Sequence, residues 1–165
     1  MPLLILVIII FGIGAFTMTT KTHTAASKPA GSSSVRGIRN NNPLNIRIGN
    51  NAWKGKVTPS RDNAFETFQS PEWGFRAGAV LLRNYQRRYE LQTLSEIIHR
   101  FAPPTENHTT NYARFVARRV GVGMDERIDL VGNKTLLADV LHAMSIMEVG
   151  HHYNKSTAVK GVSLA

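Results

Sequence analysis

The stretch KTLLADVLHAMSIMEVG, residues 134–150, decides the fold of this chain. Its apolar residues surround the axis of a helix instead of forming one stripe, which is typical of a helix buried at the centre of a domain. We expect this helix to run from Lys134 to Val149, and Gly150 to end it. Other elements of the domain should pack around it.

Glu148 stands near the end of that helix, four residues after Met144 and seven after Leu141, on a face with these apolar side chains. Burial and the negative end of the helix dipole should both raise the pKa of its carboxyl. A carboxylic acid protonated near neutral pH can protonate the leaving oxygen of a glycosidic bond. The alternative is an ordinary glutamate paired with an arginine.

Apolar residues at helical spacing predict further helices upstream. The first starts at SPE (70–72) and continues to Tyr89, and the second starts with a capping box, TLSE (93–96). A third covers about Thr110 to Val120 and ends at Gly121.

Residues 36–68 predict a small β region. The segments IRI (46–48) and GNN (49–51), followed by Trp53, indicate a hairpin, and Ala64–Phe68 adds a third short strand. The fold class is therefore mainly α, with some β structure (α+β), in a domain spanning residues 36–165.

The N-terminal segment PLLILVIIIFGIGAF (2–16) consists almost entirely of large aliphatic residues. A helix of roughly 18 residues spans about 27 Å, close to the ~30 Å hydrocarbon core of a bilayer. We predict a transmembrane anchor over residues 1–20 and a flexible linker over residues 21–35. The alternative is a signal peptide cleaved near Thr24–Ala26, but no lysine or arginine precedes the apolar run.

The net charge of +9 and the pI near 10.4 favour polyanionic partners: nucleic acid, anionic lipid or acidic wall polymers. The absence of cysteine excludes disulfides and thiolate sites. The six histidines lack ligand spacing, so no metal is expected. Arg83 with Arg87, and Arg114 with Arg118, are like-charged pairs, either a solvated face or a place for phosphates.

Several blocks of this chain resemble, in order, the lysozyme-like transglycosylase group of phages and prophages, which are virion-associated peptidoglycan-degrading proteins. They are RGIRNNNPLNIR (36–47), the pair Phe65 and Phe68, GFRAGAVLLRNY (74–85), FAPPTENHTTNYARFVARRVG (101–121) and MEVG (147–150). The resemblance implies a lysozyme-like domain over most of residues 36–165.

The order of the motifs differs from the pattern of many lytic transglycosylases. There, a helix ending in Glu, a small residue and Gly precedes an Asn-rich turn and short strands. Here the turn NNNP (40–43) comes first and the glutamate helix last, so the chain looks circularly permuted. The usual Glu-Asn-Gly pattern is also changed, because Val149 follows Glu148.

The resemblance implies that Glu148 protonates the oxygen between N-acetylmuramic acid and N-acetylglucosamine. It would then act as base on the 6-hydroxyl of the sugar, giving a 1,6-anhydro product without metal or cofactor. Hydrolysis would normally need a second carboxylate. Glu66, which lies between two aromatic residues of the predicted strand, is the rival or second acid.

Other side chains are candidates for binding the glycan. The asparagines could bind N-acetyl groups or the catalytic carboxyl, the aromatic residues could stack on sugars, and the segment before the third helix could line a cleft. The alternatives are turn chemistry, core packing and helix capping. The candidates are Asn41, Asn42, Asn45, Trp53, Asn107, Thr110 and Tyr112.

These features together predict a single-pass protein of a virion membrane or host inner membrane, whose domain reaches the cell wall. Its expected partners are peptidoglycan strands, the bilayer through residues 2–20, other virion proteins and, more weakly, nucleic acid. The expected activity would serve when the phage genome enters the cell or at lysis. The alternative is a non-enzymatic minor virion membrane protein that binds glycan, lipid or DNA, or one that acts in assembly.

Overall fold

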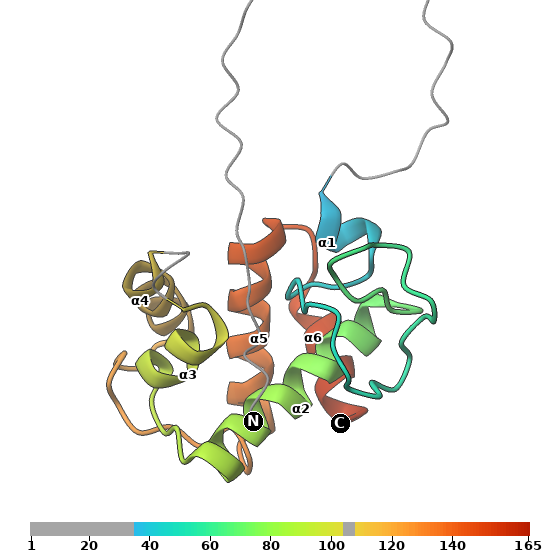
Figure 1. Cartoon of the computed structure of the whole chain (residues 1–165). Coiled ribbons are helices and arrows are strands. Elements are labelled where there is room, and N and C mark those ends of the chain that lie inside the picture. Colours follow the sequence, from blue (N-terminus) through green and yellow to red (C-terminus); the bar gives the residue numbers. More distant parts are fainter. Residues whose placement is uncertain (1–34, 104–107) are drawn as a thin grey trace, which may run out of the picture.

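The structure is a computed structural model that describes residues 35–103 and 108–165. Within these residues the chain is mainly helical, and helix α5 stands at the centre (Figure 1). Helices α3 and α4 lie on one side of α5 in this view, and α1, α6 and a long loop region lie on the other. The helices are α1 (Arg36–Arg39), α2 (Pro71–Tyr89), α3 (Leu94–Phe101), α4 (Thr109–Val120), α5 (Lys134–Val149) and α6 (Lys155–Ser163).

The central position predicted for α5 is confirmed. Leu137, Val140, Leu141 and Met144 have no exposed surface, and α5 packs against α1, α2, α4 and α6. Its boundaries also agree with the prediction, and Gly150 ends it with a φ of 75°, a left-handed value that favours glycine. The helix therefore forms the core against which the other elements pack.

The three helices predicted before α5 are also confirmed. In α3 the capping box is complete, because the Glu96 amide donates to Thr93 Oγ1 at 3.2 Å and the Thr93 amide donates to Glu96 Oε2 at 3.0 Å. Helix α4 begins at Thr109, whose hydroxyl donates to the carbonyl of Ala102 at 2.6 Å, and it ends at Gly121. This hydrogen bond joins the start of α4 to the end of α3.

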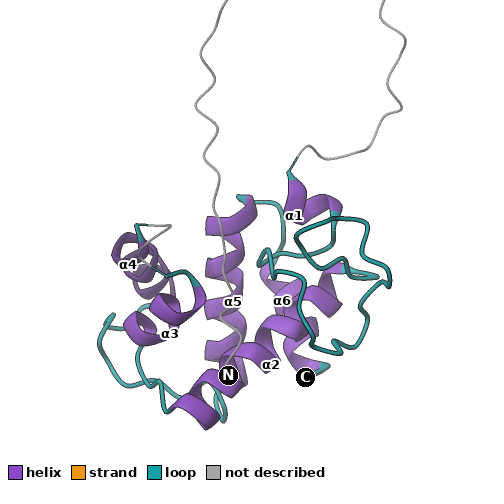
Figure 2. Cartoon of the chain, viewed as in Figure 1, coloured by secondary structure: helices purple, strands orange, loops and turns teal. Residues whose placement is uncertain are grey.

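The predicted hairpin between residues 46–48 and Trp53 is wrong. Arg47 instead forms an antiparallel bridge with Phe65, and Lys56 forms another with Phe68. The predicted third strand thus lies between the two segments, and the pairings stay isolated bridges, drawn as loop between α1 and α2 (Figure 2). The reason is the buried amide of Asn42, which bonds the backbone of residues 46 and 66 and so selects the partner of this segment.

Two short helices were not predicted. Helix α1 has only four residues, and the buried residues of α6 are the small side chains Ala158, Gly161 and Val162, which give a weak periodic signal. Helix α6 nevertheless packs closely on α2. A Cβ atom at Gly161 would clash with Phe75 and would lie 2.9 Å from the carbonyl oxygen of Glu72.

The predicted anchor over residues 1–20 and most of the linker over 21–35 lie outside the described residues. Among the helices of residues 35–103 and 108–165, none is long and apolar enough to cross a membrane.

We expect Gly161→Ala to destabilise the protein by about 1–3 kcal/mol, because the added methyl group would force α6 away from α2. Helix propensity alone predicts the opposite sign, since alanine is favoured over glycine by about 1 kcal/mol inside a helix. Chemical denaturation would measure the free energy of unfolding. Ser156→Ala, at an exposed position of the same helix, is the control and should change it little; an unchanged or raised stability of Gly161→Ala would refute the close contact.

Candidate active site at the end of helix α5

The carboxyl of Glu148 lies in the last turn of α5 and is held by side chains from two other segments. Asn45 Nδ2 donates to Glu148 Oε2 at 3.0 Å, and the Tyr112 hydroxyl, from α4, donates to Glu148 Oε1 at 3.0 Å. Asn45 Nδ2 also lies 3.4 Å from the backbone carbonyl oxygen of Glu148. Each carboxyl oxygen thus has one neutral donor.

The surroundings raise the pKa of Glu148 from 4.5 to about 7. Burial is the largest cause, because it penalises the charged form, while the hydrogen bonds from Asn45 and Tyr112 act in the opposite direction. No lysine or arginine forms an ion pair with Glu148 within the described parts of the chain, so the arginine-paired alternative is not what the structure shows there. The residue as a whole is partly exposed.

Tyr112 remains a hydrogen-bond donor at any ordinary pH. Burial and the neighbouring Glu148 raise the pKa of its hydroxyl well above 10. Its ring is 1% exposed and packs edge-to-face against Phe101, with ring centroids 6.5 Å apart. The phenol is therefore fixed by the core, and only its hydroxyl serves the site.

Asn45 owes its position to a left-handed backbone conformation, with a φ of 46°. Asparagine adopts this region more readily than most residues. The backbone amide of Asn45 also donates to the carbonyl of Asn42 at 3.1 Å, which closes the turn. The turn thereby directs the Asn45 side chain at a residue 103 positions later in the chain.

Gly37 allows α1 to lie directly against the end of α5. A Cβ atom at this position would come within 2.5 Å of both Asn45 Oδ1 and Val149 Cγ1. Val149 is 7% exposed, so in this chain it is a packing residue between α1 and α5. Val149, which stands where the Glu-Asn-Gly pattern has asparagine, therefore takes part in a close contact that holds the Asn45 turn beside Glu148.

No protein-family model matches the sequence. The chain is 41% identical over 119 residues to Protein P5 of Pseudoalteromonas phage PM2, and the match covers 70% of this chain and 72% of that protein. The chain belongs to the Protein P5 family. This P5-family membership supports the expected phage setting, while the relative's name states no activity, so the function is argued from the site.

The other asparagines of the P5-family chain hold the loop together. Asn41, with a φ of 51°, donates to the carbonyl oxygens of Phe68 and Gln69 at 3.1 and 3.3 Å. Asn42 is fully buried, and its amide bonds Ile46 and Glu66 on both sides. Asn42 therefore cannot contact a glycan, and the prediction that it binds the substrate is wrong. Hydrogen bonds within the loop account for the positions of both Asn41 and Asn42.

The predicted sugar-stacking role of Tyr112 is also corrected, because a ring that is 1% exposed has no free face for a sugar. Trp53 is partly exposed and packs against the core, and its Nε1 atom has no hydrogen-bond partner in the described residues. Thr110 is exposed in the first turn of α4. Asn107 lies outside the described residues, so Trp53, Thr110 and Asn107 stay predictions.

Glu66, the rival acid, is fully buried in a separate environment. Its Oε1 atom forms an ion pair with Lys56 Nζ at 3.0 Å and accepts from the Gly49 amide at 3.3 Å. Among the described residues no hydrogen bond or ion pair joins Glu66 to Glu148. Its Oε1 atom is thus occupied in closing the loop, its Oε2 atom has no hydrogen-bond partner in the described residues, and its role as a second acid stays a prediction without a supporting contact.

The contact of the Tyr112 hydroxyl with Glu148 was not predicted from the sequence, although a signal existed. A buried tyrosine hydroxyl usually needs a hydrogen-bond partner, and Glu148 was an acid expected on an apolar helix face. No group of three or more acidic or histidine side chains that could hold a metal is found in residues 35–103 and 108–165.

The raised pKa of Glu148 should make the stability of the protein depend on pH. Because the folded-state pKa lies above the unfolded value of 4.5, the stabilising contribution is complete below pH 4.5 and is lost as pH rises through about 7. Between these values the wild type should lose about 1–3 kcal/mol relative to Glu148→Gln, which does not titrate.

Denaturation curves at pH 5 and at pH 8 would measure this difference, with Glu90→Gln, at an exposed position, as the control. The control should follow the wild type. Parallel pH dependence of wild type and Glu148→Gln would show that Glu148 has an ordinary pKa.

Proposed function

We propose that this member of the P5 family is a membrane-anchored phage enzyme that degrades peptidoglycan. The reaction we assign to it is that of a lytic transglycosylase, a muramidase-type glycosidase that cuts the bond between N-acetylmuramic acid and N-acetylglucosamine. The observation that carries the proposal is the carboxyl of Glu148, which has a pKa of about 7 and a neutral donor on each oxygen, in a residue that is partly exposed. Such a group can give and take a proton near neutral pH.

Glu148 acts first as an acid. Its proton passes to the oxygen that links the sugars, the bond from that oxygen to the anomeric carbon of N-acetylmuramic acid breaks, and N-acetylglucosamine leaves as an alcohol. The glutamate, now a carboxylate, accepts the proton of the 6-hydroxyl of the same muramic acid. The freed oxygen attacks the anomeric carbon and closes a 1,6-anhydro ring, which leaves Glu148 protonated again.

Asn45 and Tyr112 are positioning residues in this scheme. They fix the carboxyl by its two oxygens and stabilise its charged form, which opposes the effect of burial on the pKa. Without them the pKa of a buried carboxyl would rise further, and the group would become a weaker acid. They therefore adjust the acidity of Glu148 for use near neutral pH.

The ion pair of Glu66 with Lys56 favours a transglycosylase over a hydrolase. Inverting and retaining glycosidases use a pair of carboxyl groups that flank the scissile bond. Glu66, the rival acid, is fully buried, and its Oε1 atom is paired with Lys56 at 3.0 Å. A reaction in which the sugar supplies its own nucleophile needs only one acid.

The setting of the reaction is part of the proposal. The apolar segment 2–16 would anchor the protein in a virion or host inner membrane, with the domain reaching the cell wall. The contact between the Asn-rich turn and the glutamate helix, from opposite ends of the domain sequence, supports a circularly permuted lysozyme-like design. The activity would serve when the genome enters the cell or at lysis.

A digest of purified peptidoglycan tests the activity. We expect the 165-residue chain, in non-ionic detergent, to release 1,6-anhydro muropeptides that mass spectrometry identifies, and Glu148→Gln to lower the rate by at least 10²-fold, since general acid–base catalysis typically contributes that much. Glu90→Gln is the matched control and should be fully active.

Products with reducing ends would replace the transglycosylase with a hydrolase and direct attention to Glu66. If a folded wild type gave no products, the enzymatic proposal would fail in favour of a non-enzymatic virion protein.

The pH profile tests the role of Tyr112. Because its hydroxyl stabilises the carboxylate, Tyr112→Phe should raise the pKa of Glu148 and shift the alkaline limb of the cleavage rate upward in pH. The limb of the wild type should lie near pH 7. Tyr89→Phe, at an exposed tyrosine of α2, is the control and should leave the profile unchanged; a limb that does not move in Tyr112→Phe would exclude the proposed positioning role.

A further inference from the structure

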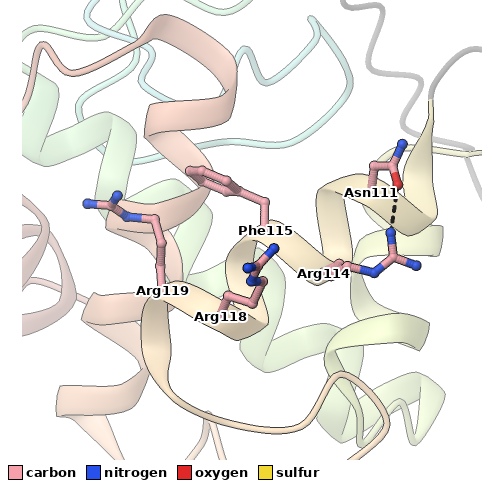
Figure 3. A pocket seen from close by; sticks show the side chains of 5 residues that line it. All are labelled: Asn111, Arg114, Phe115, Arg118 and Arg119. Carbon is pink, nitrogen blue, oxygen red and sulfur yellow. Dashed lines mark hydrogen bonds between the residues drawn. The ribbon is translucent and has the colours of Figure 1, made fainter.

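A shallow pocket lies on α4, the helix that also carries Tyr112. It has a volume of about 380 Å³, and Figure 3 shows its side chains spread around the ring of Phe115. We call it the α4 arginine pocket. Its lining residues are Asn111, Arg114, Phe115, Arg118 and Arg119.

The positive charge of this pocket has no counterpart in the described protein. Arg114, Arg118 and Arg119 are exposed, and none of them forms an ion pair with a carboxylate of residues 35–103 or 108–165. Arg114 donates to Asn111 Oδ1 at 2.8 Å, and the guanidinium of Arg119 lies 5.7 Å from the centre of the Phe115 ring. These neutral contacts orient guanidinium groups that are still free to bind an anion.

Arg114 and Arg118 also stand one helical turn apart, where like charges destabilise a helix. An anion bound between them would remove this repulsion. A guanidinium presents a planar set of N–H donors that matches a carboxylate or a phosphate. The pocket therefore fits an anionic ligand that also has an apolar part to cover Phe115.

The position of the pocket indicates the source of this anion. Tyr112, which bonds the Glu148 carboxyl, lies between Asn111 and Arg114 in α4. From Tyr112 to Arg118 the helix advances roughly 9 Å. Phe115 comes three residues after Tyr112 and therefore lies on the same side of α4, so the pocket belongs to the helix that presents Tyr112 to Glu148.

We propose that the α4 arginine pocket binds the carboxylates of the peptide that branches from N-acetylmuramic acid at the scissile bond. This inference rests on the proposed function. An extended peptide of roughly four residues spans about 14 Å, which exceeds the roughly 9 Å by which α4 advances from Tyr112 to Arg118. Its free carboxylates would meet the guanidinium groups, and its aliphatic side chains would lie on Phe115. The protein would then prefer peptide-bearing peptidoglycan to bare glycan strands.

Binding to glycan strands immobilised on beads tests this preference. The full chain is used in non-ionic detergent, in the Glu148→Gln background so that the strands stay intact. One batch of strands keeps its peptides, and the other has lost them to an amidase that cuts them from the muramic acid. We expect Arg114→Glu with Arg118→Glu to weaken binding to the peptide-bearing batch about tenfold and to leave binding to the stripped batch unchanged.

Arg87→Glu with Arg88→Glu is the matched control, because it makes the same change of charge at exposed positions of α2. It should alter binding to either batch less than twofold. If the glutamate pair in α4 prevents folding, Arg114→Gln with Arg118→Gln replaces it and should show the same selective loss, with circular dichroism confirming the fold.

The outcomes separate this inference from the proposed function. Equal losses of binding on both batches, or an equal loss in the control variant, would overturn the pocket as a peptide site. If the Arg114 and Arg118 changes weakened retention on duplex DNA and left peptidoglycan binding unchanged, the pocket would be a phosphate site instead. If the protein with an intact Glu148 cleaves peptidoglycan and the Arg114 and Arg118 changes have no effect, the proposed function stands and the pocket proposal fails. If binding depends on the peptides but no cleavage is seen, the pocket proposal stands and the enzymatic function fails.

Discussion

The carboxyl of Glu148 is held at the end of the central helix by an amide and a phenol, with no cation to balance it among the described residues. This constraint organises the domain around it. Helix α5 must be surrounded by apolar side chains to bury the group, α4 must present Tyr112, and the Asn45 turn must be brought to the same point. A cation in place of either donor would stabilise the charged form and lower the pKa, so the choice of neutral partners sets the acidity of the site.

The irregular region between α1 and α2 has a positioning task that explains its composition. Asn42 replaces a regular sheet by bonding the backbone of two segments with one buried amide, and Glu66 with Lys56 closes the same loop from the other side. Gly37 then lets α1 touch Val149, so the whole loop is packed against the end of α5. A region with little secondary structure is in this way held beside the site by specific side-chain contacts.

Much of the helical framework could be predicted, because its signals are local. The capping box at Thr93 and the apolar pattern of α5 depend on residues within a few turns of one another, and the same pattern places Glu148 on an apolar face of that helix. The pairing of residues 46–48 could not be predicted, since a side-chain amide and not the turn at 49–51 selects the partner. Helix α6 was missed because small residues that fit closely against Phe75 carry little periodic signal. The contact of Tyr112 with Glu148 depends on how α4 packs on α5, which no local pattern specifies.

The distance in sequence between Asn45 and Glu148, 103 residues, also bears on how the protein is made. Contacts between remote parts of a chain form late in folding, because a large loop must close first. During synthesis the ribosome releases the Asn45 turn long before the glutamate that it will hold. On the function proposed above, a nascent chain would therefore be harmless to the wall of the cell that produces it, and the acid would become competent only once the central helix had emerged and docked.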